Sequence, residues 1–298
     1  GNLSVGGSGK TPVVRRVTEI LREAGHRVAI LSRGYGGRFR GDALVVSDGK
    51  EVLADADTAG DEPVMLARAL PGVVVAVGPR RDVVGRAVES RFGPCVHVLD
   101  VGFQHLRLER DLDVVCLDVQ DLGDLPMPAG RLREDPKALE RADVVLLTRL
   151  EAATEEEIEA LEGRLGAERT FRVGRRAAGW RTVEGEAVEP PEQVYLFAGI
   201  ARPQRFERDA AASGATIVGR TFFGDHHRYR REEIALLDRD ARAAGASALG
   251  TTAKDAVRLG SGAPGGPDLP LLVLEVEPTL DDEDRFRKTL LDAVGNPA

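Results

Sequence analysis

Ser4-Val5-Gly6-Gly7-Ser8-Gly9-Lys10-Thr11 lies near the start of this 298-residue chain and matches a phosphate-binding loop. Such a loop reads Gly, any four residues, Gly, Lys and then Ser or Thr, and here Ser4 replaces the first glycine. Glycines let backbone N–H groups turn towards phosphate oxygens, and the helix that follows adds the positive end of its dipole. The sequence therefore predicts a phosphate site, formed by Gly6, Gly7, Ser8, Gly9, Lys10 and Thr11.

Two side chains of this loop carry its chemistry. The ammonium of Lys10 would lie against the terminal phosphates of a nucleoside triphosphate, and the hydroxyl of Thr11 would ligate Mg²⁺. Lysine is scarce in this chain, with five lysines among 41 Lys and Arg residues, so a lysine here indicates that a compact point charge is needed. The alternative is a glycine-rich turn that only precedes an ordinary helix.

The sequence that follows the loop alternates between helical and strand patterns. Apolar residues at helical spacing follow Pro12 and stop at Gly25, and short aliphatic runs recur after them. Buried parallel strands give continuous apolar runs of this kind, so we expect an α/β fold. The expected strands are Val28–Leu31, Ala43–Val46, Val73–Val77, Val96–Leu99, Val114–Leu117 and Val144–Leu147.

A second series of strands follows a change of pattern at Thr170–Val188, which predicts a short β-hairpin connector. The later strands are expected at Tyr195–Ala198, Thr216–Val218, Ser247–Thr251 and Leu271–Val276. We therefore predict three consecutive parts. They are a P-loop NTPase-like α/β/α domain at 1–168, a two-stranded hairpin linker at 169–192 and a smaller α/β domain at 193–298.

Composition excludes several classes of protein. Lys plus Arg number 41 and Asp plus Glu number 49, so the net charge is −8, and there is no overall basic surface for nucleic acid. Two cysteines, Cys95 and Cys116, are too few for a disulfide scaffold. No apolar stretch reaches the ~18 residues that span a bilayer. Because the chain starts at Gly1 with no strand before the loop, we expect that an N-terminal segment is missing.

Acids and histidines stand at positions where ligands bind in α/β folds. Asp61 opens a helix, where an acid also serves as a simple electrostatic cap. Asp100 follows the run Val96–Leu99, which puts it at the carboxyl edge of a parallel sheet, as a Mg²⁺-binding acid or as a turn residue. The adjacent His226 and His227 are too few for a zinc site, and a catalytic histidine is favoured.

Eight motifs together give the chain a resemblance to the tetraacyldisaccharide 4'-kinase family. Two of them, Ser-Arg-Gly-Tyr-Gly-Gly and Phe-Ala-Gly-Ile-Ala-Arg-Pro, are specific strings, and the motifs run nearly from end to end. They lie at Gly1–Pro12, Leu31–Gly37, Gly60–Pro63, Gly102–His105, Pro128–Glu134, Phe197–Pro203, Asp225–His227 and Thr251–Asp255.

The resemblance implies a function and a setting. Enzymes of this family move the γ-phosphate of ATP, with Mg²⁺, to the 4' hydroxyl of a tetraacylated glucosamine disaccharide 1-phosphate, which gives lipid IVA, an intermediate of lipid A. They join a P-loop domain to a smaller α/β domain through a two-stranded linker. They also carry an N-terminal hydrophobic helix at the inner membrane, which would precede Gly1. We therefore expect a peripheral enzyme, monomeric, on the cytoplasmic face of that membrane.

The resemblance also assigns roles to single residues. Asp61 matches an acid that pairs with a histidine to activate the acceptor hydroxyl, and His226 is the best match for that histidine, with His227 as the second choice. Lys10 matches the catalytic lysine of the loop. The expected metal-binding residues are Thr11, Asp100 and Glu134, and the expected acceptor-binding residues are Tyr35, Arg81, Gln104 and His105.

The chain departs from the family pattern at two positions, and this keeps two other functions open. The family has a second Asp where this chain has Val101, and a Glu where it has Ala253. Loss of a carboxylate near Mg²⁺ would suit a non-catalytic relative that only binds nucleotide or lipid. The loop alone also fits a nucleotide-dependent switch or metallochaperone ATPase or GTPase, although the chain has neither a Cys/His cluster nor a guanine signature.

Overall fold

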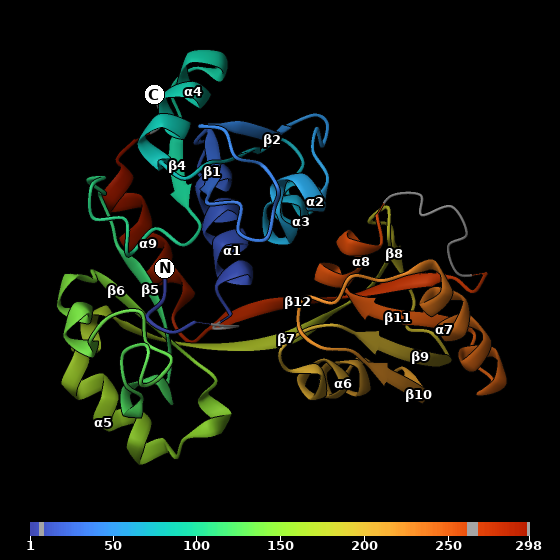
Figure 1. Cartoon of the computed structure of the whole chain (residues 1–298). Helices are drawn as coiled ribbons and strands as arrows, with labels where there is room; N and C mark the ends of the chain where they lie inside the picture. The colour runs from blue at the N-terminus through green and yellow to red at the C-terminus, as the bar shows by residue number, and fades with distance from the viewer. Residues whose placement is uncertain (6–8, 261–267, 297–298) are drawn as a thin grey trace.

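The computed structural model describes residues 1–5, 9–260 and 268–296, and its strands form two sheets (Figure 1). The smaller sheet has the strand order β2-β3-β1-β4, in which β1 is parallel to β3 and β4, and β2 is antiparallel to β3. The α/β fold expected from the sequence is thereby confirmed. The bounds are β1 (Val28–Ser32), β2 (Leu44–Asp48), β3 (Val74–Val77) and β4 (Val96–Leu99).

The larger sheet runs through both parts of the molecule. Its order is β10-β9-β11-β12-β7-β6-β5, with the short β8 paired to β7. All neighbouring strands are parallel except for the pairs β12–β7 and β7–β8. The bounds are β5 (Val114–Asp118), β6 (Val144–Thr148), β7 (Thr170–Thr182), β8 (Ala187–Val188), β9 (Gln193–Ala198), β10 (Thr216–Phe222), β11 (Ala248–Thr252) and β12 (Leu271–Leu280).

The long strands β7 and β12 connect the two parts of the molecule in Figure 1. They pair antiparallel from Leu272↔Thr182 to Leu280↔Val173, with one irregularity between Glu275 and Val276. The hairpin expected at 169–192 exists only as two residue pairs between β7 and β8, so the main partner of β7 comes from the C-terminal end of the sequence. The division at 168 and 192 stays a prediction.

Helices cover the sheets, and the first and last of them share one hydrophobic cluster. From α1, Val13 and Ile20 pack with Phe286 and Leu290 of α9 around the buried Phe171. The structure thus brings the last helix back onto the first. The helix bounds are α1 (Lys10–Glu23), α2 (Ala56–Ala59), α3 (Asp61–Ala69), α4 (Arg81–Phe92), α5 (Glu155–Leu165), α6 (Pro203–Ala212), α7 (Arg231–Ala243), α8 (Ala253–Leu259) and α9 (Glu283–Val294).

Helix α8 joins the two parts of the molecule at a second place. It follows β11 directly, yet its Val257 is buried in the hydrophobic cluster that holds Val64 and Leu66 of α3. The helices α3 and α8 therefore pack against each other. Among the helices of the described ranges, none has the length and apolar character needed to cross a membrane.

Candidate functional site

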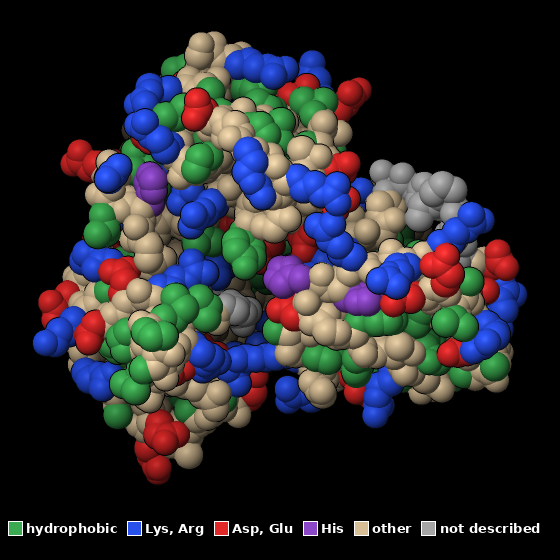
Figure 2. All heavy atoms as spheres, in the orientation of Figure 1, with side chains coloured by type: hydrophobic (Ala, Val, Ile, Leu, Met, Phe, Trp, Pro, Cys, Tyr) green, Lys and Arg blue, Asp and Glu red, His purple; other side chains and the backbone are tan. Residues whose placement is uncertain are grey.

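Two cavities meet between the parts of the molecule. One, of about 870 Å³, is lined by Lys10 and Thr11 at the start of α1 and by residues of α3, α6 and α8. The other, of about 1020 Å³, is lined by the segment 33–41 and by Arg258. Both are also lined by Asp61 and His226. Figure 2 shows the hollow between the two parts, with basic side chains gathered at its edges.

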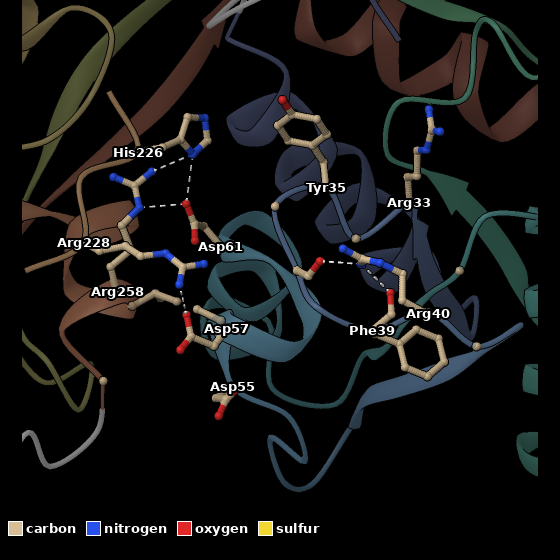
Figure 3. Close-up of a pocket in the computed structure, with 18 of the residues that line it drawn as sticks. Arg33, Tyr35, Phe39, Arg40, Asp55, Asp57, Asp61, His226, Arg228 and Arg258 are labelled. Atoms are coloured by element: carbon tan, nitrogen blue, oxygen red, sulfur yellow. Dashed lines mark hydrogen bonds and ion pairs between the residues drawn. The ribbon is translucent and has the colours of Figure 1, made fainter. Parts of the chain in front are cut away.

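Asp61 and His226 are brought together from opposite sides of this hollow. Asp61 is the first residue of α3, and His226 follows β10 with a left-handed backbone of φ 59°. The Nδ1 of His226 lies 3.3 Å from Oδ2 of Asp61 (Figure 3). The two residues are 165 positions apart in the sequence, and the fold places them in contact. The chemical role of the pair stays a prediction.

His227, the second choice for the catalytic histidine, faces another group. Its ring is stacked on Phe223 with the centroids 4.4 Å apart, and its Nε2 lies 3.0 Å from Oε2 of Glu233. Glu233 is itself held at the start of α7 by the backbone N–H of Arg230. The geometry therefore assigns His226, and not His227, to the contact with Asp61.

Arg258 completes this contact and was missed by sequence reasoning. Its Nε donates to Oδ2 of Asp61 at 2.7 Å, and its Nη2 lies 3.2 Å from Nδ1 of His226. The sequence does contain a signal for Arg258. It stands four residues after Lys254, which belongs to the motif that ends at Asp255. One turn of helix puts both cationic side chains on the same face of α8.

The lysine and the acid expected beside the phosphates lie in a buried setting. Burial lowers the pKa of Lys10, and the carboxylates of Asp100 and Glu62 oppose this shift. Burial likewise raises the pKa of Asp100, which Lys10 opposes. Asp100 accepts from the hydroxyl of Ser32 at 3.2 Å through Oδ2. A phosphate beside Lys10 would favour its charged ammonium, and a cation beside Asp100 would favour its charged carboxylate. Gly6, Gly7 and Ser8 lie outside the described residues.

The three residues expected to bind metal have different surroundings in the structure, and their role stays a prediction. Oδ1 of Asp100 is buried with no hydrogen-bond partner among the described residues, and Thr11 lines the 870 Å³ cavity. Both carboxylate oxygens of Glu134 instead accept from Arg141, at 2.9 and 3.1 Å. Within the described ranges, no cluster of three His, Cys, Asp or Glu side chains is arranged to hold a metal ion.

The four residues expected to bind the acceptor all line the 870 Å³ cavity. Tyr35 is 78% exposed, whereas Arg81 is 6% exposed and donates to the carbonyl groups of Gly78 and Pro79. Burial and the charge of Arg81 lower the pKa of His105. Several buried polar atoms lack a partner in the described structure, and each would suit a polar ligand. They are Nε of Arg81, Oε1 of Gln104 and Nε2 of His105.

Three more arginines line the same cavity from β7 and α6, and sequence reasoning did not single them out as a group. They are Arg175, Arg202 and Arg205. Burial and the nearby charge of Arg205 lower the pKa of Arg175 to about 10. Arg202 lies 3.6 Å from the buried Asp118. Each of the three is also in an ion pair: Arg175 with Asp209, Arg202 with Asp118 and Arg205 with Glu151 at 3.4 Å.

Comparison with known proteins gives consistent results along the whole chain. A sequence model described as tetraacyldisaccharide-1-P 4'-kinase matches residues 1–295. A tetraacyldisaccharide 4'-kinase of Geobacter metallireducens is 44% identical over 267 residues, which cover 87% of this chain and 77% of that protein. One from an Anaeromyxobacter species (strain Fw109-5) is 44% identical over 303 residues, which cover 97% and 80%.

A solved structure agrees with these sequence matches. The crystal structure of LpxK from Aquifex aeolicus in complex with ATP superposes with a TM-score of 0.78 at 30% sequence identity. The superposition covers 98% of this chain and 86% of that one.

Proposed function

This chain belongs to the tetraacyldisaccharide 4'-kinase family, and on that premise we propose that it transfers the γ-phosphate of ATP to the 4' hydroxyl of a tetraacyldisaccharide 1-phosphate. The product would be lipid IVA, on the route to lipid A. One observation carries the proposal: the Asp61–His226 contact lies in the same cavity as Lys10 and Thr11. A base for a hydroxyl group and a site for polyphosphate are thus side by side.

His226 acts as the general base. With its ring proton on Nδ1, it donates to Oδ2 of Asp61, 3.3 Å away, and Nε2 carries the free lone pair. Nε2 then accepts the proton of the sugar hydroxyl as the oxygen attacks the γ-phosphorus, and the bond between the γ-phosphorus and the β-phosphate oxygen breaks, so that ADP leaves. A positioned base of this kind contributes roughly 10²–10⁴-fold to the rate.

Lys10 and the start of α1 stabilise the charge on the transferred phosphoryl group. Approach of the polyphosphate favours the charged ammonium of Lys10, which burial otherwise disfavours. The unpartnered Oδ1 of Asp100 and the hydroxyl of Thr11 are oxygen ligands of the kind that Mg²⁺ prefers, so these residues would hold the ion. Mg²⁺, when bound, neutralises phosphate charge. Glu134 would join them only after it leaves Arg141.

The acceptor is held on the other side of the cavity. Arg81 offers a cationic N–H with no partner in the described structure, which suits a sugar phosphate. Gln104 and His105 offer further unpartnered polar atoms to the sugar hydroxyls, and the exposed ring of Tyr35 lines the same cavity. These assignments extend the family pattern to the positions that match it.

The enzyme works as a monomer at the cytoplasmic face of the inner membrane, where its lipid acceptor lies. Among the described residues, three leucine and methionine side chains are more than half exposed and suit contact with acyl chains or the membrane surface. They are Leu106, Leu125 and Met127. The parts 1–168, 169–192 and 193–298 would move relative to one another as ATP and the lipid bind.

The test is transfer of labelled phosphate from ATP·Mg²⁺ to tetraacyldisaccharide 1-phosphate in detergent. We expect transfer by the wild-type chain and loss of at least about 100-fold in Lys10→Ala. His226→Gln should lose about 10²–10⁴-fold, whereas the matched variant His227→Gln should keep activity, because its ring contacts Glu233 instead of Asp61. Equal losses in the two histidine variants would contradict the assignment of the base.

The same assay separates the other two functions. ATP binding without transfer would indicate a non-catalytic relative, in which Val101 and Ala253 leave the site incomplete. Preference for GTP over ATP, without phosphate transfer to the lipid, would indicate a nucleotide-dependent switch.

A further inference from the structure

Arg258 is a nearly buried charged side chain beside the Asp61–His226 pair. Its side chain is 3% exposed, although it lines the larger cavity. Besides Asp61, it contacts the Gly199 carbonyl oxygen at 2.6 Å and Oδ1 of Asp255 at 3.1 Å through Nη1. A buried guanidinium is stable only with such partners.

Contacts with Asp255, on the same helix α8, fix the guanidinium of Arg258 independently of Asp61. Asp255 is fully buried and accepts from the backbone N–H of Gly199 at 3.0 Å and from the hydroxyl of Tyr229 at 2.9 Å. Its other oxygen bonds Thr252 at 2.6 Å. Asp255 therefore has one preferred position, and it determines the plane of the guanidinium.

The opposite side of the guanidinium faces the reacting pair. Nε donates to Oδ2 of Asp61, and Nη2 lies 3.2 Å from Nδ1 of His226, so that a single planar group contacts both residues (Figure 3). When Nδ1 carries the ring proton, both nitrogens are donors, and the hydrogen bond of Nδ1–H goes to Asp61 alone. Asp61 and His226 come from separate elements, α3 and the segment after β10, with no shared backbone hydrogen bond to keep them in register. The carboxylate of Asp225 is also near the ring, with its Oδ2 3.9 Å from Nε2.

A second ion pair supports the same approach of α8 to α3. Lys254 lies one helical turn before Arg258, and its Nζ is 3.3 Å from Oε1 of Glu62. Val257 packs between these two contacts into the cluster below α3. One face of α8 thus forms ion pairs with two successive residues, Asp61 and Glu62, at the N-terminal end of α3.

We propose that Arg258 is a positioning residue for phosphoryl transfer, which rests on the proposed kinase function. It does not touch the phosphates or the acceptor. It holds the carboxylate of Asp61 in the orientation that receives Nδ1–H of His226, and it does so only while α8 lies against α3. Closure of the two parts of the molecule and assembly of the base are therefore one event.

The test compares Arg258→Ala and Arg258→Lys with Arg239→Ala, an exposed arginine on α7. Arg258→Ala should lower kcat by about 10–100-fold and change the KM for ATP less than about twofold, because the phosphate loop is untouched. Arg258→Lys keeps the charge but not the fork, so it should fold normally and still lose most of the kcat. Added guanidinium ion at millimolar concentration should restore part of the activity of Arg258→Ala. Arg239→Ala should match the wild type.

A double-mutant cycle distinguishes positioning from a general structural role. In an Asp61→Asn background, Arg258→Ala should lower kcat by less than about a further twofold, because the partner of Arg258 is already altered. Undiminished loss in that background, or wild-type kcat in both Arg258 variants, would overturn the inference while leaving the kinase function intact. A wild-type chain that binds ATP and transfers no phosphate would instead overturn the proposed function, and the inference with it.

Discussion

Val101 and His226, two residues that line the 870 Å³ cavity, hold their backbones in the left-handed region, with φ of 57° and 59°. This conformation costs roughly 1–2 kcal/mol for residues other than glycine and is least suited to a β-branched side chain. At His226 the backbone N–H donates to the Gly199 carbonyl and to Oδ1 of Asp225, which holds the turn. The structure gives Val101 no comparable compensation among its described contacts.

Val101→Asp should therefore be stabilising. Aspartate tolerates the left-handed region better than valine, so we expect the melting temperature to rise by about 1–3 °C, for a gain of roughly 0.5–1 kcal/mol. The added carboxylate lies at the edge where Asp100 would hold Mg²⁺, so kcat should be kept or increased. Calorimetry and the transfer assay measure the two effects, and Val101→Gly, which relieves the backbone without a carboxylate, is the control. A fall in both quantities would contradict this account.

Some of the site could be predicted from residues, and some could not. Motifs in the sequence pointed to Asp61 and His226, and the fold brings the two side chains into contact. The role of Arg258 could not be predicted, because it depends on the packing of α8 against α3. At this contact Arg258 and Asp61 are 197 positions apart in the sequence. Glu134 was assigned by motif, and its ion pair with Arg141 belongs to local loop geometry that a motif does not specify.

At the scale of elements, the strands were predicted closely and their partners less well. The expected Val96–Leu99 coincides with β4, and Val144–Leu147 differs from β6 by one residue, because aliphatic runs in buried parallel strands have clear ends. The pairing of β7 was missed. Adjacent strands in sequence favour a hairpin, but β8 is only two residues long, whereas β12 offers ten.

The junction of α5 with β7 gives a prediction at this scale. Arg172 bonds both oxygens of Glu162, at 2.6 and 2.8 Å, and this hydrogen bonding holds the pKa of Glu162 below its ordinary value. Since the folded pKa is the lower one, the stabilisation is complete above the unfolded value of about 4.3 and is lost as the pH falls through the folded value. Glu162→Gln should lower the melting temperature by about 2–4 °C at pH 7, for roughly 1 kcal/mol.

That difference should shrink as the pH is lowered from 7 towards 3, because the wild-type carboxylate is then protonated as well. Thermal unfolding at several pH values checks this, with Glu159→Gln, an exposed position on the same helix, as the control. A difference that stays constant with pH would mean that the ion pair contributes nothing.

For the whole molecule, the return of α9 onto α1 is the contact that closes the first part of the structure. Phe286 is 1% exposed and packs edge-to-face against Phe171, with the ring centroids 5.4 Å apart. Arg285 lies over the ring of Phe171, 3.8 Å from its centroid. The expected C-terminal domain at 193–298 did not predict this contact, because the pattern of an amphipathic helix does not specify which core the helix will cover.

Phe286→Ala should therefore weaken a core built mostly of N-terminal residues. We expect a loss of about 3–5 kcal/mol in the free energy of unfolding, measured by denaturant titration. Asp292→Ala, at an exposed position of the same helix, should change it by less than about 0.5 kcal/mol. A loss of similar size in the two variants would show that α9 is only loosely attached.

The pairing of β7 with β12 has a consequence for folding during synthesis on the ribosome. Residues 170–182 leave the ribosome long before residues 271–280, and at roughly 5–20 residues per second the first strand waits several seconds for its partner. During that wait an unpaired strand edge and the apolar face of α1 are both uncovered. Newly made chains are thus most exposed to aggregation just before residues 271–280 emerge, when chaperones would matter most.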